Sequence, residues 1–250
     1  MKALDQGEIE EIMWNISKGV KFLSDLEARF IVSLLEYLEE EQKEVFKRVL
    51  DVACGWGRHH KILRRKGFEV YGLDLNKRFV EKARKLYPEF SYQVGDMRKL
   101  PYRGESFDAI LDIFTSFGYF SEEENKKCLE EFYRVLRRGG IFTIETTNAD
   151  WAKCNFQHVY TEEVGDDLLV ISKGGWEGKF WVWNRSLHHQ RGENLRKIGE
   201  RKARLRLYSK DELDKLAEEI GYEPLIALSG LSAQPLKQDS PRMLLVYRKG

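Results

Sequence analysis

The stretch that decides the fold is RVLDVACGWGRHH, residues 48–60, an apolar run that stops at two glycines. Val49, Leu50 and Val52 are typical of a buried strand that carries one carboxylate, Asp51. Glycines between a strand and a helix let the backbone approach a ligand closely, because no Cβ intervenes. The stretch therefore predicts either a ligand-binding turn or, as the alternative, a tight strand-to-helix turn without a ligand.

Composition bounds the class of protein. The chain has 250 residues, 42% of them hydrophobic and 33% charged, which suits one large α/β domain or a domain with an appendage. No apolar run approaches the ~20 residues that a membrane-spanning helix needs, and the N-terminus lacks the layout of a signal peptide. Cys54, Cys128 and Cys154 fit neither a zinc site nor a disulfide framework. We expect a cytoplasmic protein without a metal and, at net charge +1, without an overall footprint for nucleic acid.

Strand and helix signals alternate from residue 48 to about 150. Strands are expected at 49–53, 69–73, 90–94, 108–114 and 141–145. The helices between them are expected from about 57 to 66, from Asn76 to before Pro88, and from the capping box Ser121–Glu124 to about 136, where residues 137–140 close the helix. Such alternation predicts a parallel sheet with helices on both faces.

The pattern changes after about residue 150. Apolar pieces at 168–172, 180–187 and 203–207 are joined by glycines with no helical periodicity, which is typical of an antiparallel meander. A second capping box, Ser209–Glu212, opens a helix that ends before Gly221. Strands at 224–228 and 243–248 finish the chain, while residues 8–47 have helical periodicity.

Acidic residues after the next strands narrow the kind of ligand. Asp74 ends the second strand, where a carboxylate commonly accepts both ribose hydroxyls. Asp96 follows the third strand, and Met97 offers a backbone N–H and an apolar face for a base. A dinucleotide fingerprint needs a third glycine where His60 stands, and no Gly-rich phosphate loop is present. A nucleoside without phosphates fits better.

At this point the chain resembles the class I S-adenosylmethionine-dependent methyltransferases. Five segments carry the likeness in order: VLDVACGWG, YGLDLN, VGDMRKLPYRGESFDAI, ILDIFTSFGYF and VLRRGGIF. The resemblance spans about residues 45–150 and resumes at LYSKDELDKLAEEIGYEP and SPRMLLVYRK. It implies a doubly wound, mostly parallel seven-stranded Rossmann-like sheet with a β-rich antiparallel insertion. We expect a single domain with N-terminal helices at 1–47, a cofactor-binding core at 48–150, a cap at 151–207 and closing elements at 208–250.

The resemblance also implies S-adenosyl-L-methionine as cofactor and a set of residues that bind it. In that family the glycine turn holds the methionine moiety, and the acid ending the second strand takes the ribose hydroxyls. The residues after the third strand border the adenine, and the aromatic after the fourth lies near the sulfonium. The corresponding residues here are Ala53, Cys54, Gly55 and Gly57; Asp74 and Leu75; Asp96 and Met97; and Phe114. Arg58 either meets the methionine carboxylate or faces solvent, and Asp51 is expected to support the loop.

The insertion is the candidate pocket for a methyl acceptor, because it begins at the carboxyl edge of the sheet. Its aromatic faces suit a cationic sulfonium or a planar acceptor, although they can equally form the meander's own core. They are Trp151, Phe156, Tyr160, Trp176, Phe180, Trp181 and Trp183. Methyl transfer needs orientation and exclusion of water, and a base only where the acceptor is protonated; His158 and Tyr160 are candidates for that base. The N-terminal helices, including Trp14, are a candidate lid.

The sequence thus predicts a methyltransferase acting on a small molecule by in-line displacement. The first alternative is an RNA or tRNA methyltransferase that uses the basic run RKIGERKARLR at 196–206, although alternation there also suits a half-buried strand. The second is a non-catalytic protein that binds S-adenosylmethionine. Residues 112–115 are DIFT rather than the N-P-P-[YF] of amino-methylating nucleic-acid enzymes, which disfavours that chemistry.

Overall fold

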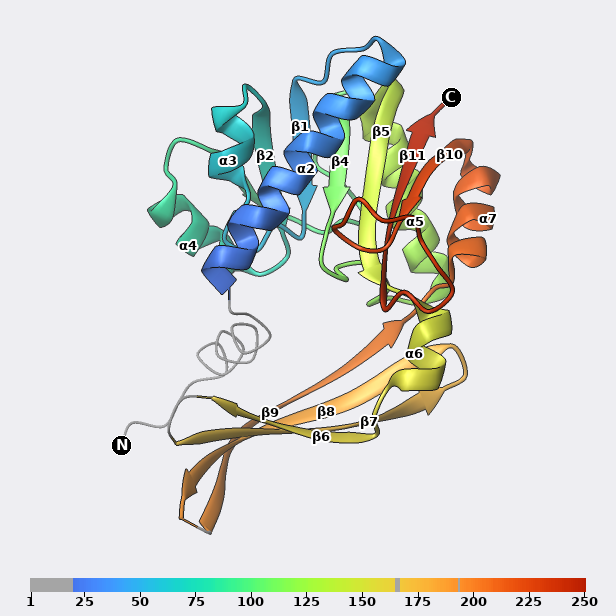
Figure 1. The fold of residues 1–250 in the computed structure, drawn as a ribbon. Helices are drawn as coiled ribbons and strands as arrows, with labels where there is room; N and C mark the ends of the chain where they lie inside the picture. Colours follow the sequence, from blue (N-terminus) through green and yellow to red (C-terminus); the bar gives the residue numbers. More distant parts are fainter. Residues whose placement is uncertain (1–19, 165–166, 193) are drawn as a thin grey trace.

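The computed structural model describes residues 20–164, 167–192 and 194–250. Its larger sheet has seven strands in the order β10-β11-β5-β4-β1-β2-β3 (Figure 1). The strands are β1 (Arg48–Val52), β2 (Glu69–Asp74), β3 (Ser91–Val94), β4 (Phe107–Asp112), β5 (Leu136–Thr147), β10 (Tyr222–Leu228) and β11 (Arg242–Lys249). β1 to β5 pair in parallel, whereas β11 runs antiparallel to both of its neighbours. The predicted doubly wound, mostly parallel sheet is confirmed.

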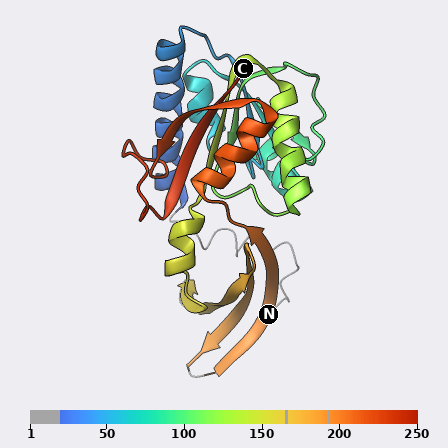
Figure 2. The same ribbon diagram turned by 90° about the vertical axis from the view of Figure 1, so that its right-hand side faces the viewer.

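Helices cover both faces of this sheet (Figure 2). They are α2 (Val20–Gln42), α3 (His60–Arg65), α4 (Lys77–Leu86), α5 (Glu122–Val135) and α7 (Lys210–Ile220). On one face Leu35 of α2 and Leu63 of α3 are fully buried in the same cluster as Val49 of β1. On the other face Phe132 of α5 and Leu213 of α7 join a second cluster. Each such side chain stabilises the fold by about 1.5–3 kcal/mol. Within the described residues, no helix is long and apolar enough to cross a bilayer.

The insertion forms a second sheet of four antiparallel strands in the order β6-β7-β8-β9. In Figure 1 it lies below the seven-stranded sheet and its helices, which together are called the first layer. The strands are β6 (Val159–Val164), β7 (Leu168–Glu177), β8 (Phe180–Arg191) and β9 (Asn194–Arg206). The meander is therefore confirmed, with longer strands than expected. Between the layers lies α6 (Ala149–Asn155), which the sequence analysis missed although Asn148 caps it by accepting from the N–H of Asp150.

The second sheet is fastened to the first layer at Gly118 and Arg206. The Arg206 N–H donates to the Gly118 carbonyl at 2.8 Å. The Arg206 guanidinium is buried and pairs with Glu122 on α5 at 3.0 Å and with Glu212 on α7 at 2.7 Å. Burial alone would raise the pKa of Glu212, but hydrogen bonds from Arg206 and other donors hold it at about 2. Arg206, the last residue of the basic run, is thus a structural cation.

Three predicted boundaries are wrong for identifiable reasons. The helix expected from about residue 57 begins at His60, because Gly57 is left-handed with φ of 72°. The strand expected to reach Phe114 ends at Asp112, because Phe114 and Thr115 are also left-handed. Residues 137–140, expected to close a helix, lie inside β5 instead. β5 already pairs with β4 at Leu136, and a register shift before Ile141 accommodates residues 137–140. Residues 1–19, with Trp14 and its role as a candidate lid, lie outside the described residues.

Gly118→Ala should destabilise the protein by more than about 2 kcal/mol. Gly118 has φ of 105°, and a Cβ there would lie 2.3 Å from the carbonyl oxygen of Arg206, so backbone strain and a clash at the junction add up. The matched control is Gly178→Ala, with φ of 59° and no described atom within 4 Å of the added Cβ, which should cost roughly 1 kcal/mol. Denaturant unfolding compares the two. Equal losses would show that Gly118 is not a packing constraint.

Candidate functional site

The carboxyl ends of the parallel strands bring the predicted residues into one row. Because the strand order is β3-β2-β1-β4-β5, the row runs from Asp96 after β3 to Asp74 at the end of β2. It continues through the glycine turn after β1 and Phe114 after β4 to Glu145 in β5. This edge is where open parallel sheets bind ligands.

The turn after β1 contains three residues with left-handed backbone conformations. Ala53, Gly55 and Gly57 have φ of 53°, 58° and 72°. A Cβ at Gly57 would lie 2.2 Å from the hydroxyl of Tyr92, so only glycine fits there. Ala53 has no such freedom, and a strained non-glycine residue of this kind is typical of functional sites. The turn also buries Cys54, whose N–H donates to the Leu73 carbonyl at 3.1 Å.

Asp74 is oriented by the turn that it faces. The Gly55 N–H donates to Oδ2 and the Asn76 N–H to Oδ1, each at 2.8 Å. Burial raises the pKa of the Asp74 carboxyl, and these two hydrogen bonds oppose that rise. Each carboxylate oxygen keeps a lone pair that can accept a hydroxyl. Beside it Leu75 is 62% exposed, an apolar surface next to the carboxylate.

His60 fixes the position of the Asp51 carboxylate behind the turn through a hydrogen bond. Its Nε2 lies 3.0 Å from Oδ2 of Asp51, and its ring stacks on Tyr92 with centroids 5.0 Å apart. His60 is fully buried. The position where a dinucleotide site would have its third glycine is therefore filled by a ring that braces the turn, in agreement with the supporting role expected of Asp51.

Arg58 is buried between α2 and the glycine turn. Its Nη1 lies 2.8 Å from Oε2 of Glu27 and donates to the hydroxyl of Ser24 at 3.2 Å. The side chain is 9% exposed, so the alternative that it faces solvent is wrong. Its guanidinium carbon lies 5.0 Å from the centroid of Phe114. Arg58 therefore links α2 to the aromatic ring in the middle of the row.

Asp96 and Met97 stand at the far end of the row. The Arg98 guanidinium lies 2.6 Å from Oδ2 of Asp96, and its hydrogen bonds lower the pKa of that carboxyl. Arg98 also pairs with Glu124 of α5, which fixes the loop after β3. Met97 packs against the core under α5. The two predicted residues thus sit in an anchored loop next to β2.

Glu145 and Arg242 hold the strained segment after β4. The Phe114 N–H donates to Oε2 of Glu145 at 2.9 Å, and the Thr115 N–H donates to its carbonyl at 2.9 Å. Arg242, at the start of β11, donates to Oε2 of Glu145 at 2.7 Å and to the Thr115 hydroxyl at 3.0 Å. Its guanidinium lies 5.0 Å from the Phe114 centroid, like that of Arg58. These contacts keep Phe114 and Thr115 at φ of 72° and 57°.

Neither Glu145 nor Arg242 is among the site residues predicted from the sequence. Glu145 could have been found, because it is an acid near the end of an apolar strand, as Asp74 is. No feature of the sequence marks Arg242 as a site residue, because its place at this edge depends on the antiparallel direction of β11.

Two cavities share Phe114 as a wall. The smaller, of about 50 Å³, lies at the glycine turn and is lined by residues such as Ala53 and Arg58. The larger, of about 490 Å³, lies between the two layers and has the size of a small-molecule site. Its walls include Thr115 and Tyr119 from the first layer, and Tyr160, Trp181 and Trp183 from the second.

The aromatic residues of the insertion divide between the two roles expected of them. Trp181 is 8% exposed and packs on Phe156 with ring centroids 4.9 Å apart, so it builds the core as well as the cavity wall. Trp183 is less buried and lies 6.5 Å from the ring of Tyr119 across the cavity. Tyr160 lines the cavity, whereas His158 lies outside its walls and bonds the Gly174 carbonyl at 2.9 Å.

The basic run at 196–206 does not form one continuous face. It lies on β9, where Arg201 lines the cavity while Lys202 and Arg204 are exposed on the opposite face. Arg206 is buried in its ion pairs. The alternation is that of a two-faced strand.

Known proteins resemble the chain most clearly in its core. Residues 49–140 match the protein family described as a methyltransferase domain. The chain is 33% identical over 127 residues to demethylmenaquinone methyltransferase of Renibacterium salmoninarum, covering 50% of this chain and 52% of that protein. It is 28% identical over 146 residues to dTDP-3-amino-3,4,6-trideoxy-alpha-D-glucopyranose N,N-dimethyltransferase of Streptomyces venezuelae, covering 58% of each. The chain therefore spans about half the length of the curated relatives it matches.

Solved structures share the fold beyond this core. The crystal structure of Streptomyces venezuelae DesVI matches with a TM-score of 0.75 at 21% identity, covering 100% of both chains. A structure of an S-adenosylmethionine-dependent methyltransferase from Clostridium acetobutylicum matches with a TM-score of 0.77 at 18% identity, covering 90% of this chain and 91% of that one. At these identities the likeness shows the fold. The predicted fold class is confirmed, and so is the resemblance to the class I S-adenosylmethionine-dependent methyltransferases.

Glu145→Gln should destabilise the protein by roughly 1.5–3 kcal/mol, the range for hydrogen bonds to a charged group. It leaves Arg242 without its carboxylate and weakens the acceptor of the Phe114 N–H. Glu223→Gln is the matched control, because Glu223 pairs with Arg248 in an exposed ion pair and should cost less than about 1 kcal/mol. Urea unfolding measures both. A cost at Glu145 no larger than at Glu223 would contradict the structural role given to this carboxylate.

Proposed function

We propose that this chain is an S-adenosylmethionine-dependent methyltransferase that transfers a methyl group to a small-molecule acceptor by in-line displacement. The observation that carries the proposal is the position of Phe114, which lines both the small cavity at the glycine turn and the large cavity between the layers. A ring that lies at the glycine turn and also lines the large cavity is the place where a donor held at the turn and an acceptor in that cavity can meet.

The residues of the edge fit the donor. The glycine turn offers its backbone without side chains, Asp74 keeps lone pairs for ribose hydroxyls, and Leu75 and Met97 offer apolar contacts for a base. When bound, S-adenosylmethionine supplies a methyl group activated by a sulfonium. We assign its binding to the ten residues of the predicted set, with Arg58 toward the methionine end.

Buried acids at the same edge favour a cation there. Burial, followed by the nearby charges of Asp51 and Glu145, raises the pKa of Asp112 well above its ordinary value. A positive group at this edge would favour the ionised form of the Asp112 carboxyl.

The acceptor side has the properties of a small-molecule pocket. Trp183, Tyr119 and Leu205 supply apolar walls that exclude water, while a few polar groups fix orientation. The relatives named for demethylmenaquinone and for an amino sugar nucleotide support a small molecule as acceptor. An RNA substrate would need one continuous basic face, which β9 does not supply. A non-catalytic binder would not need an aromatic cavity beyond Phe114.

We place this enzyme in the cytoplasm. Cys54, Cys128 and Cys154 are free thiols in the described structure, and thiols stay reduced in that compartment.

Asp74→Asn should weaken binding of S-adenosylhomocysteine by roughly tenfold to a hundredfold, about 1.5–3 kcal/mol, because a charged acceptor of two hydroxyls is lost. Isothermal titration on folded protein measures this. The matched control is Asp108→Asn: Asp108 likewise accepts two backbone N–H groups, from Lys47 and Arg48, but at the opposite edge of the sheet. That variant should lose stability and keep its affinity within about twofold. Unchanged affinity in Asp74→Asn would remove Asp74 from the site.

A further inference from the structure

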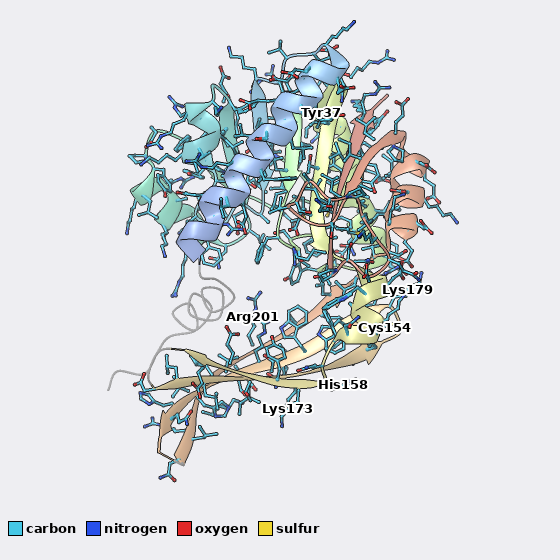
Figure 3. All side chains as sticks on the ribbon, viewed as in Figure 1. Tyr37, Cys154, His158, Lys173, Lys179 and Arg201 are labelled. Carbon is cyan, nitrogen blue, oxygen red and sulfur yellow. The ribbon has the colours of Figure 1, made fainter. Side chains whose placement is uncertain are left out.

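A row of four polar side chains crosses the inner face of the second sheet. In the strand registers Tyr160 pairs with Ser172, Ser172 with Arg185, and Arg185 with Arg201. Directly paired residues of an antiparallel sheet project from the same face. All four line the large cavity, and Figure 3 shows Arg201 on the side of the sheet that faces the first layer. The row is therefore a polar floor under an otherwise aromatic cavity.

Two like charges stand directly opposite each other in this row. Arg185 and Arg201 are cross-strand partners, and a like-charged pair in that position destabilises a sheet. None of the described side chains that line the cavity is a carboxylate. The other arginine of the cavity, Arg242, is already neutralised by Glu145. The repulsion between Arg185 and Arg201 is thus left without a counter-charge in the described part of the chain.

The same row holds polar atoms that lack a hydrogen-bond partner. The hydroxyl of Ser172 and the Nε of Arg185 are buried and bond no other described atom. Ser172 is 2% exposed, so its side chain sits at the bottom of the cavity. Arg185 does donate from Nη2 to the hydroxyl of Tyr160 at 2.6 Å, which holds the guanidinium in place. Buried donors without acceptors cost free energy unless a ligand accepts from them.

We propose that this row, Tyr160, Ser172, Arg185 and Arg201, binds an oxyanion group of the methyl acceptor, either a carboxylate or a phosphate. Guanidinium forks match the oxygens of both groups, and the Ser172 hydroxyl adds one more donor. The aromatic walls at Trp183 hold the body of the acceptor. The charged end then lies on the second sheet, and the reacting end points to Phe114. Only the description of the ligand as the acceptor rests on the proposed function.

The test is titration with small probes that share one ring. Phenyl phosphate and benzoate should bind the wild-type protein at least tenfold more tightly than phenol does. Arg201→Gln and Arg185→Gln should each weaken phenyl phosphate and benzoate at least tenfold, and Arg201→Lys should restore part of the loss. The matched control is Arg204→Gln on the outer face of the same strand, which should leave both anions within about twofold. Tighter binding of phenyl phosphate than of benzoate identifies a phosphate-bearing acceptor, and the reverse order identifies a carboxylate.

Stability gives a second readout that a merely structural arginine would not produce. Because it removes repulsion, Arg201→Gln should melt no lower than the wild type. The inference is overturned if phenol binds as tightly as the anions, if neither anion binds, or if Arg204→Gln loses as much anion affinity as Arg201→Gln. S-adenosylhomocysteine is titrated into the same variants and should bind each of them like the wild type. If the wild-type protein does not bind S-adenosylhomocysteine, the proposed function is wrong. The anion titrations still decide whether the four-residue row binds an oxyanion.

Discussion

The candidate site depends on one buried carboxylate, that of Glu145. It accepts the N–H of Phe114, and its backbone carbonyl accepts the N–H of Thr115, so two non-glycine residues stay in left-handed conformations that cost free energy on their own. Arg242 neutralises the carboxylate from β11, which ties the end of the parallel sheet to its antiparallel strand. Strain held in this way places the Phe114 ring beside two guanidiniums and in the walls of two cavities.

The two layers present different surfaces to the proposed ligands. The parallel sheet presents a row of acids and a bare glycine turn along its carboxyl edge, where the proposed donor binds. The antiparallel sheet presents aromatic rings and a pair of arginines, where the proposed acceptor binds. Gly118 and Arg206 join the layers, so the spacing of the two surfaces depends on a backbone hydrogen bond and on the ion pairs of the buried Arg206 guanidinium.

Local signals in the sequence were enough to predict the first layer. Apolar runs that end in Gly55 or Asp74 and the capping boxes at Ser121 and Ser209 locate its elements, and the structure confirms both boxes. Predictions failed where a long-range contact overrides the local signal. Residues 137–140 resemble a turn, yet pairing with β4 draws them into β5. The Arg185–Arg201 pair depends on a register that spans β8 and β9, and a bulge after Leu187 shifts that register in a way that no single segment encodes.

The most direct measurement is a crystal structure of the protein with S-adenosylhomocysteine. The ribose should lie at Asp74, and the sulfur should lie beside Phe114. The side of the sulfur that carries the methyl group in S-adenosylmethionine should face the cavity that Trp183 and Arg201 line. A ligand bound away from the glycine turn, or one whose sulfur faces away from that cavity, would contradict the assignment of the glycine turn to the donor and of the large cavity to the acceptor.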